Sequence, residues 1–422
     1  MAVMVRKIRA FGVAALASTC LLLGGECAVG PLARSAVAGD WSGRLDAGVQ
    51  TLGVVFHVEA AKCTLDVPDQ GAFGIAGTTR CADAESVEMT FGAIGGSFSG
   101  KLKDGKLIGV WRQGGGELPL TLTAGKPKAV RPQEPKPPFP YRTESVAFTN
   151  SDAVLCGTLT LPEKCRKDTP VLLMVTGSGP QNRDEELFDH RPFAVIADFL
   201  ARQGIATLRY DDRGVGESKG KTKNVSIEDI LLDAETGVDF LRGRFSRVGV
   251  LGHSEGGTVA FMLAQKGKAD FVVSLAGSAL RMGDVLDGQL RRRLKAAGKS
   301  EDEIARELPQ LKRTFVKDDG IRRYLGYDPL AAIRATHCPV LALNGERDTQ
   351  VICGEHLPVL RENLVPKEKM TVKSCPGLNH LFQHCKTGEF VEYAKIEETI
   401  APEVLSEIAA FVRRLRSVPE SE

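Results

Sequence analysis

A serine flanked by glycines is the first candidate for chemistry in this chain. The pentapeptide Gly252-His253-Ser254-Glu255-Gly256 follows an apolar run, Val248 to Leu251, that predicts a buried strand, and precedes an apolar run that predicts a helix. A sharp turn between a strand and a helix exposes a serine hydroxyl, and small neighbours give the turn steric room. Ser254 is therefore the candidate nucleophile. A glycine-rich turn without chemistry is the alternative.

A serine hydroxyl is a poor nucleophile at neutral pH, so it needs a base nearby and a carboxylate that orients the base. The chain has seven histidines, and His380 lies in a loop after the last predicted strand, where it is the candidate base. His384 is its nearest competitor. The candidate acid is Asp348, which follows a predicted strand between the serine and the histidine, with Glu346 as the alternative. Ser254, Asp348 and His380 then form a Ser-Asp-His triad.

The oxyanion of a tetrahedral intermediate also needs hydrogen-bond donors. The first expected donor is the backbone N–H of Glu255, directly after the nucleophile. The second is expected from the loop Thr176-Gly177-Ser178-Gly179-Pro180, where Ser178 is the candidate. This loop lacks the lysine of a P-loop, which argues against a nucleotide site.

The elements that must position these residues alternate between strand and helix from residue 141 onward. An opening hairpin is expected at 146–148 and 158–161, and buried parallel strands at 171–175, 205–210, 248–251, 271–275, 340–343 and 370–372. Helical periodicity after a Ser226 cap and near the C-terminus predicts helices between them. The pattern predicts an α/β fold with a mostly parallel sheet. An insertion at about 281–327 is expected to form amphipathic helices and a lid over the site, or else a peripheral helical hairpin.

The N-terminal part of the chain has a different organisation. Residues 1–38 are expected to be an export signal, with cleavage after Ala38, because a charged start precedes an apolar stretch too short to span a bilayer. Residues 39–125 alternate apolar and polar positions between turn signals, which predicts a small antiparallel β domain. Residues 126–140 are rich in proline and predict an extended linker before the domain at 141–418.

Composition narrows the function. The formal charge of +2 comes from mixed signs, so no nucleic-acid groove is expected, and after signal cleavage we expect no stable membrane insertion. We expect the protein to be periplasmic or secreted, with no cofactor and no metal site. Eight cysteines remain beyond the signal, an even number that favours disulfides in an exported chain. The proposed pairs are Cys375 with Cys385, Cys63 with Cys81, and Cys156 with Cys165, although spacing alone cannot decide connectivity.

Four segments together resemble a known family. They are Thr176-Gly177-Ser178-Gly179-Pro180-Gln181-Asn182-Arg183-Asp184, Arg209-Tyr210-Asp211-Asp212-Arg213-Gly214-Val215-Gly216, Gly252-His253-Ser254-Glu255-Gly256-Gly257 and Pro376-Gly377-Leu378-Asn379-His380. Through them residues 141–418 resemble the bacterial α/β-hydrolase esterases of the EstD type, which also match serine-aminopeptidase profiles. The resemblance implies an α/β-hydrolase fold and carboxylic ester hydrolysis. Residues 41–122 resemble the β-rich accessory domain that precedes some of these enzymes, which implies no chemistry.

The sequence therefore favours a serine esterase that acts on small acyl esters through an acyl-enzyme intermediate. A serine peptidase of the aminopeptidase kind is the enzymatic alternative, since the same triad cleaves amides. A non-catalytic envelope protein that binds a partner through its β domain is the alternative from another class.

Overall fold

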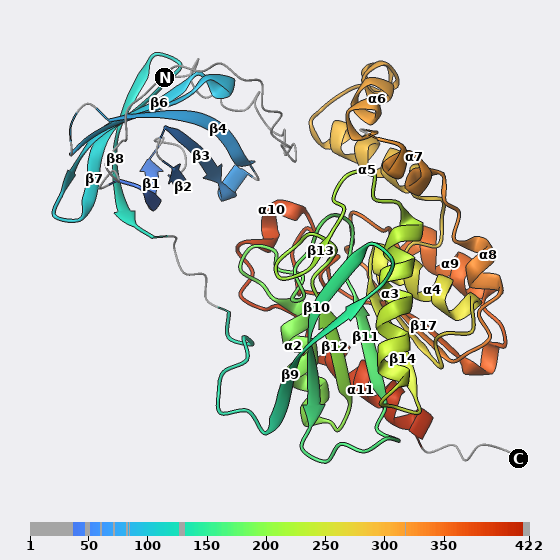
Figure 1. Ribbon diagram of the computed structural model, residues 1–422. Helices are drawn as coiled ribbons and strands as arrows, with labels where there is room; N and C mark the ends of the chain where they lie inside the picture. Colours follow the sequence, from blue (N-terminus) through green and yellow to red (C-terminus); the bar gives the residue numbers. More distant parts are fainter. Residues whose placement is uncertain are drawn as a thin grey trace, which may run out of the picture. The chain divides into compact units, whose positions relative to one another are not determined.

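The chain divides into two compact units, Met1–Ala129 and Val130–Glu422. The computed structural model describes residues 37–416 except 47–50, 60, 71, 82, 84, 126–130 and 317 (Figure 1). The expected export signal lies outside the described residues apart from Val37 and Ala38. Val37 is buried in the N-terminal unit, where its carbonyl oxygen accepts a 2.8 Å hydrogen bond from the Trp41 indole. Cleavage after Ala38 would remove this contact.

The N-terminal unit is a closed barrel of eight strands in sequence order, each antiparallel to its neighbours. Alternate side chains point inward along each strand, as a half-buried sheet requires. Aromatic rings fill the interior, where Phe56 contacts Phe91, Phe98 and Trp111 at centroid distances of 5.7, 5.7 and 6.1 Å. The strands are β1 Gly39–Asp46, β2 Thr51–Glu59, β3 Lys62–Val67, β4 Ala72–Cys81, β5 Ser86–Phe91, β6 Gly96–Lys103, β7 Lys106–Gln113 and β8 Gly116–Ala124.

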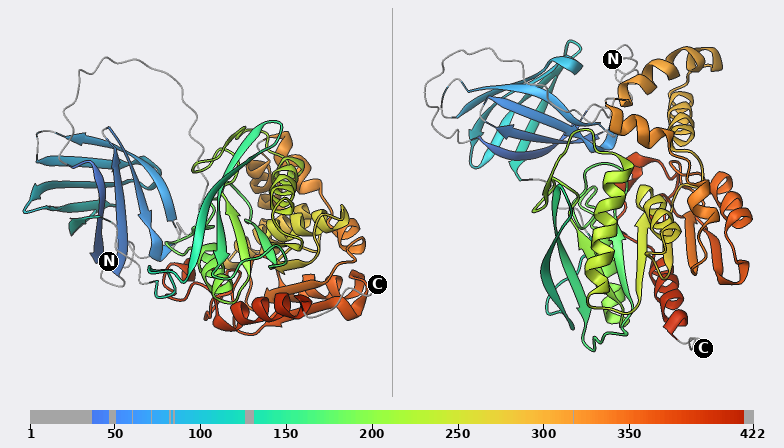
Figure 2. Two further views of the ribbon diagram at one scale, coloured as in Figure 1. Left: turned by 60° about the horizontal axis from the view of Figure 1, so that its bottom comes forward. Right: turned by 45° about the vertical axis from the view of Figure 1, so that its right-hand side comes forward.

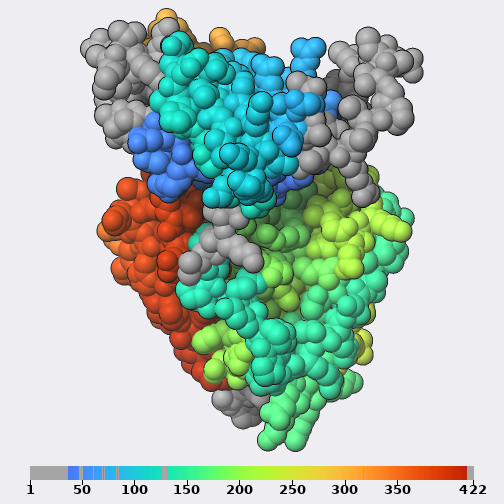
Figure 3. Space-filling view, turned by 90° about the vertical axis from the view of Figure 1, so that its left-hand side faces the viewer, coloured from blue at the N-terminus to red at the C-terminus, as the bar shows by residue number. Residues whose placement is uncertain are grey.

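The C-terminal unit is built on a nine-stranded sheet in the order β13-β10-β12-β11-β14-β15-β16-β17, with β9 paired to β10. The six strands β12, β11, β14, β15, β16 and β17 are parallel to one another, whereas β9 and β10 form the expected antiparallel hairpin. Teal and green atoms of the segment that includes this hairpin lie at the surface in Figure 3. The strands are β9 Tyr141–Thr149, β10 Ala153–Pro162, β11 Val171–Val175, β12 Ala206–Tyr210, β13 Lys219–Gly220, β14 Val248–His253, β15 Val272–Leu275, β16 Val340–Gly345 and β17 Met370–Cys375.

Helices cover both faces of this sheet, as Figures 1 and 2 show. Alternate residues of β11 lie in different cores: Leu173 belongs to the core that includes α3, α4 and α9, and Leu172 to the core that includes α2 and α11. Strands buried on both faces explain the continuous apolar runs of the sequence. The helices are α2 Pro192–Arg202, α3 Ile227–Arg242, α4 Glu255–Gln265, α8 Leu330–Arg334, α9 Cys353–Asn363, α10 Phe390–Tyr393 and α11 Pro402–Arg416. This layered sheet confirms the predicted fold class.

The segment between β15 and β16 contains the expected insertion. Three helices, α5 Met282–Ala296, α6 Glu301–Phe315 and α7 Asp319–Gly326, form a lobe beyond one end of the sheet, coloured orange in Figures 1 and 2. Ser300 begins α6 with a capping box, in which its side chain accepts from the Glu303 N–H and Glu303 accepts from the Ser300 N–H. The N–H of Met282 donates to the Tyr327 carbonyl at 3.1 Å, so the two ends of the insertion meet.

The predicted disulfides do not form. Cys375 and Cys385 are both thiols: Cys375 packs against the core on the α11 face, and the Cys385 thiol donates to the Gly377 carbonyl at 3.4 Å. Cys63 and Cys156 are thiols as well, so neither pairs with its proposed partner. The prediction was wrong because proximity in sequence does not bring two Cβ atoms within bonding geometry.

Candidate active site

The turn between β14 and α4 holds Ser254 in a conformation that few residues other than glycine adopt. Its φ and ψ angles are 52° and −114°, a sparsely populated region that persists only where the surroundings enforce it. A Cβ atom added at Gly252 would lie 1.9 Å from the Gly256 carbonyl oxygen, and one at Gly256 would lie 2.1 Å from the Val175 carbonyl oxygen. Both glycines are therefore required by close backbone packing, and the serine lies at the carboxyl end of the sheet.

The structure brings Asp348 and His380 together. The Asp348 carboxylate follows β16, is fully buried, and accepts a 2.7 Å hydrogen bond at Oδ2 from His380 Nδ1. Its Oδ1 atom accepts from the backbone N–H groups of Gln350 at 2.8 Å and Val351 at 2.9 Å. These two donors fix the carboxylate, and the carboxylate fixes the imidazole with its proton on Nδ1, which leaves Nε2 unprotonated and able to act as a base.

The loop that carries His380 is stiffened by its own main chain. Leu378 and His384 form an antiparallel bridge, and the Asn379 N–H donates to the Gln383 carbonyl at 3.0 Å. The Asn379 side chain accepts from the N–H groups of Leu381 and Gln383, both at 3.0 Å. The backbone thus supplies the restraint that a disulfide was expected to provide.

The competing residues lie in other surroundings. His384 is exposed and pairs with Glu398 at 2.9 Å and Glu403 at 3.2 Å. Glu346 is exposed and accepts from the Gly377 N–H at 3.2 Å. Neither residue contacts the Asp348–His380 pair through a hydrogen bond in the described part of the chain, so the geometry favours Asp348 and His380.

His253, the residue before Ser254, contacts His380 and so brings the serine and the histidine into the same region. His253 Nε2 lies 3.0 Å from the His380 carbonyl oxygen, and the two imidazole centroids are 4.7 Å apart. Within the described residues no hydrogen bond joins the Ser254 hydroxyl to His380. Such contacts are often long in structures without a substrate and shorten when the substrate binds.

One expected oxyanion donor is the residue directly after Ser254, and the other lies in the loop after β11. Glu255 is the first residue of α4, so its N–H has no partner within the helix. Ser178 lies in the exposed loop after β11. The N–H of Gly177 is not available to an oxyanion, because it donates to Glu185 Oε1 at 2.6 Å. Ser178 therefore stays the candidate in this loop.

A hydroxyl group from the insertion contacts the loop that carries Ser178. The Tyr324 hydroxyl, in α7, lies 3.2 Å from the Ser178 hydroxyl, and both face the Glu255 carboxyl group. Burial raises the pKa of Glu255 above its usual range, and the two hydroxyls offset only part of this effect. Burial also raises the pKa of the nearby Asp212 carboxyl to about 8.

Hydrogen bonds and ion pairs to three acidic side chains hold the loop after β11. The Gln181 N–H donates to Asp212 at 2.8 Å, and the Arg183 guanidinium bonds Asp211 at 2.6 Å and Glu217 at 2.5 Å. Charge-assisted bonds of this kind are stronger than neutral ones. They fix the loop that presents Ser178.

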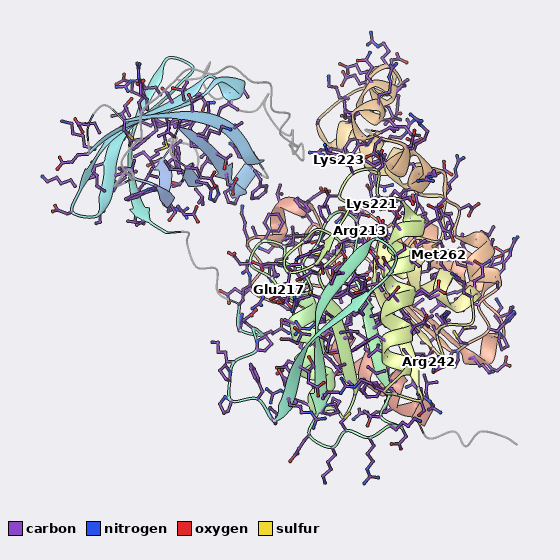
Figure 4. All side chains as sticks on the ribbon, in the orientation of Figure 1. Arg213, Glu217, Lys221, Lys223, Arg242 and Met262 are labelled. Carbon is purple, nitrogen blue, oxygen red and sulfur yellow. The ribbon has the colours of Figure 1, made fainter. Side chains whose placement is uncertain are left out.

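Arg213 forms a buried ion pair. It bonds Asp233 of α3 at 2.7 Å, with both side chains buried. Figure 4 shows Arg213 near the site end of α3, with Lys221 and Lys223 close by and Arg242 at the opposite end. Lys221 bonds Asp229 at 2.7 Å. The described residues include no cluster of three or more histidine, cysteine or acidic side chains suited to a metal ion.

The sequence reasoning missed Glu185, Asp212 as a buried acid, and Tyr324. Asp212 lay within a segment that pointed to the family, but nothing in its spacing indicated burial without a cation. Tyr324 lies in the insertion, where helical periodicity alone does not show which side chain reaches the site. The described residues contain no helix long and apolar enough to cross a membrane.

Comparisons with known proteins agree with this architecture. A family model described as serine aminopeptidase, S33, matches residues 190–342, which include Ser254 but end before Asp348. Esterase EstD of Thermotoga maritima is 32% identical over 275 residues, which cover 61% of this chain and 65% of that protein. The chain therefore spans slightly less than two thirds of the length of this relative.

Solved structures give further likenesses. The Pyrococcus furiosus esterase Pf2001 is 18% identical with a TM-score of 0.43, over 65% of this chain and 93% of that one. Est1E from Butyrivibrio proteoclasticus with bound ferulic acid is 18% identical with a TM-score of 0.46, over 64% and 98%. Proline iminopeptidase of Mycobacterium smegmatis is 16% identical with a TM-score of 0.47, over 65% and 99%. The sheet order and the turn that presents Ser254 are those of an α/β-hydrolase fold, and the chain is similar to Esterase EstD over 275 residues.

Proposed function

We propose that this chain is a serine carboxylic ester hydrolase that acts on small acyl esters through an acyl-enzyme intermediate. The observation that carries the proposal is the 2.7 Å bond between Asp348 and His380 beside a serine in a strained strand-to-helix turn. The identity to Esterase EstD supports an ester rather than another substrate. The Tyr324 hydroxyl lies 3.2 Å from the Ser178 hydroxyl, which supports a part for the insertion in shaping the acyl site.

Each residue then has a definite role. His380 Nε2 accepts the hydroxyl proton as Ser254 Oγ attacks the ester carbonyl, and Asp348 stabilises the imidazolium that forms. The N–H groups of Glu255 and Ser178 donate to the oxyanion. The imidazolium gives its proton to the departing alcohol, which leaves an acyl group on Ser254. Water, deprotonated by His380, then attacks the acyl carbon and releases the carboxylic acid.

Turnover of p-nitrophenyl acetate and butyrate tests the proposal. We expect Ser254→Ala to lower the rate by roughly 10⁴ to 10⁶ while the protein stays folded, because a triad member is lost. A fluorophosphonate should label the wild-type serine and not the variant. If the folded variant kept more than about 1% of wild-type turnover, Ser254 would not be the nucleophile. If the folded wild-type protein failed to react with the probe, a non-catalytic binding protein would be the better account.

A serine peptidase is the second candidate, and two observations favour it. The matching family model describes serine aminopeptidases, and the Glu255 carboxyl is buried directly beside the nucleophile, where it could bind a substrate amine. Hydrolysis of aminoacyl nitroanilides faster than of nitrophenyl esters would favour this candidate. Loss of only the nitroanilide activity in Glu255→Gln would assign the amine contact.

We also propose that the protein is exported and that α5–α7 act as a lid. Export is supported by the charged and apolar pattern of residues 1–38, and the lid by the contact of Tyr324 with Ser178. Cell fractionation, with N-terminal sequencing of the mature protein, tests export. A cytoplasmic, uncleaved chain would contradict it.

A further inference from the structure

Two buried side chains beside the candidate triad have no part in the mechanism so far. Glu185, in the loop after β11, and His253, directly before the nucleophile, are 5% and 6% exposed. Glu185 Oε1 lies 2.9 Å from His253 Nδ1. Glu185 has a φ of 53°, a strained backbone for a non-glycine residue. The local fold thus holds this carboxylate against the histidine at an energetic cost.

The hydrogen bonds define the charge of this pair. His253 Nε2 lies 3.0 Å from the His380 carbonyl oxygen, which can only accept, so Nε2 carries a proton. Glu185 Oε1 already accepts from the Gly177 N–H at 2.6 Å, which favours a carboxylate. With both imidazole nitrogens facing acceptors, this geometry favours an imidazolium at His253. Burial acts to lower the pKa of His253, but the charge and hydrogen bond of Glu185 more than offset this, and the pKa is raised.

The pair joins three segments whose relative positions the proposed reaction depends on. Glu185 holds the Gly177 N–H of the oxyanion loop, His253 is next to Ser254, and its second N–H holds the main chain of His380. A Cβ atom at Gly177 would lie 3.1 Å from Glu185 Oε1 and 3.4 Å from the Ser254 Cβ, so the loop and the nucleophile are closely packed. Displacement of either contact would move a reacting group.

Apolar surroundings strengthen the electrostatic attraction between Glu185 and His253. A crevice next to Glu185 and His253 is lined by apolar side chains, among them Phe193, Leu275 and Phe382. Electrostatic interactions are strengthened where water is excluded. A buried ion pair that loses one partner leaves an uncompensated charge, so each member depends on the other.

We propose that Glu185 and His253 are positioning residues, a buried ion pair that aligns the oxyanion loop and the His380 loop with Ser254. The proposal rests on the proposed function, because the alignment serves the attack of Ser254. Neither side chain needs to touch the substrate. The loss of the pair should therefore lower kcat and leave KM nearly unchanged.

A measurement without substrate tests the pair itself. In wild-type protein labelled with ¹⁵N at histidine, we expect the His253 ring to show two N–H signals at pH 7, assigned by their loss in His253→Gln. The Glu185→Gln variant should show one, since the neutral amide keeps hydrogen bonds to Gly177 and His253 but stabilises no imidazolium. A neutral His253 in the wild-type protein would overturn the proposal.

Kinetics test the positioning. We expect Glu185→Ala to lower kcat for p-nitrophenyl acetate by about 100-fold, the scale for misplacement of a reacting group by about 1 Å, with KM within about twofold. Glu185→Gln should recover part of this loss, to within about 10-fold of wild type, because its amide oxygen still accepts from the Gly177 N–H while the neutral His253 keeps one of its two hydrogen bonds. Glu186→Gln, at the exposed neighbouring position, should match wild type.

The outcomes separate this proposal from the proposed function. An active wild-type protein in which Glu185→Ala keeps its full kcat would overturn the positioning role alone. Equal losses in the Ala and Gln variants, or a loss carried by KM, would also overturn it. An inactive wild-type protein would reveal the failure of the proposed function before any variant was made, and the positioning role would fall with it.

Discussion

Asp348→Asn is the sharpest test of the candidate triad, because the structure fixes how the new amide must lie. Oδ1 of Asp348 faces two backbone donors, the N–H groups of Gln350 and Val351. An asparagine that turned its NH₂ group toward them would leave both donors unsatisfied, at a cost of roughly 2–6 kcal/mol. Since about 1.4 kcal/mol is a factor of ten, the amide oxygen should face these donors in the great majority of molecules.

The NH₂ group of the variant must then face His380. An amide nitrogen cannot accept a hydrogen bond, so His380 Nδ1 must become the acceptor and its proton must move to Nε2. This imidazole cannot take the proton of Ser254. We expect kcat to fall by about 10⁴, which corresponds to about 5.5 kcal/mol of transition-state stabilisation. KM should change little, because the substrate does not contact Asp348.

The assay is p-nitrophenyl acetate turnover with purified wild type, Asp348→Asn and the matched control Glu346→Gln. Thermal unfolding followed by circular dichroism should show that all three are folded, since the asparagine keeps a bond to His380. The control changes an exposed carboxylate two residues away and should retain full activity. Turnover above about 1% of wild type in folded Asp348→Asn would refute the reasoning, and an inactive Glu346→Gln would transfer the role.

Three further predictions follow from the structure. Burial lowers the pKa of His356 to about 4, and its Nδ1 accepts from the Ala279 N–H at 2.9 Å. The unfolded chain therefore binds a proton at His356 more tightly than the folded protein does. The contribution of neutral His356 to the free energy of unfolding is complete above about pH 6.5 and is lost as the pH falls toward 4, by roughly 3 kcal/mol. The free energy of unfolding, measured in urea across this pH range, should fall less in His356→Gln than in wild type. An equal fall in both proteins would contradict this. Tyr324→Phe should lower kcat/KM about fivefold through loss of one hydrogen bond of about 1 kcal/mol, and steady-state kinetics that match wild type would exclude a role for the hydroxyl. Gly256→Ala should destabilise the fold by about 3 kcal/mol or more, because its Cβ would lie 2.1 Å from the Val175 carbonyl oxygen; an unchanged melting temperature would show that the turn can relax.

Much of the C-terminal unit could be predicted because its strands are buried on both faces and its helices on one. Strands such as β11 and β14 then read as continuous apolar runs, and the loops at their carboxyl ends mark the positions of Ser178 and Ser254. Asp348 and His380 were identified by the same rule, and the structure brings their side chains together.

The rest depends on contacts between distant segments. Glu185 and His253 are 68 residues apart and meet only once the sheet has formed. Nothing local distinguishes Glu185 from its exposed neighbour Glu186. The disulfide prediction failed for a related reason, since Cys375 and Cys385 are close along the chain but their side chains have different surroundings.

The closed base of the insertion has a consequence for how this segment can be replaced. Because Met282 and Tyr327 are hydrogen-bonded to each other, α5–α7 leave and rejoin the sheet at almost one point. A graft of other helices would need to fit this junction, Gly320, which packs against the Val225 carbonyl oxygen, and the polar contacts of the insertion with the rest of the unit, among them Tyr324 with Ser178. The triad and the pair of Glu185 with His253 lie in other segments. A graft at this junction would therefore replace Tyr324 and the rest of α5–α7 and leave the reacting groups of the proposed mechanism in their own segments.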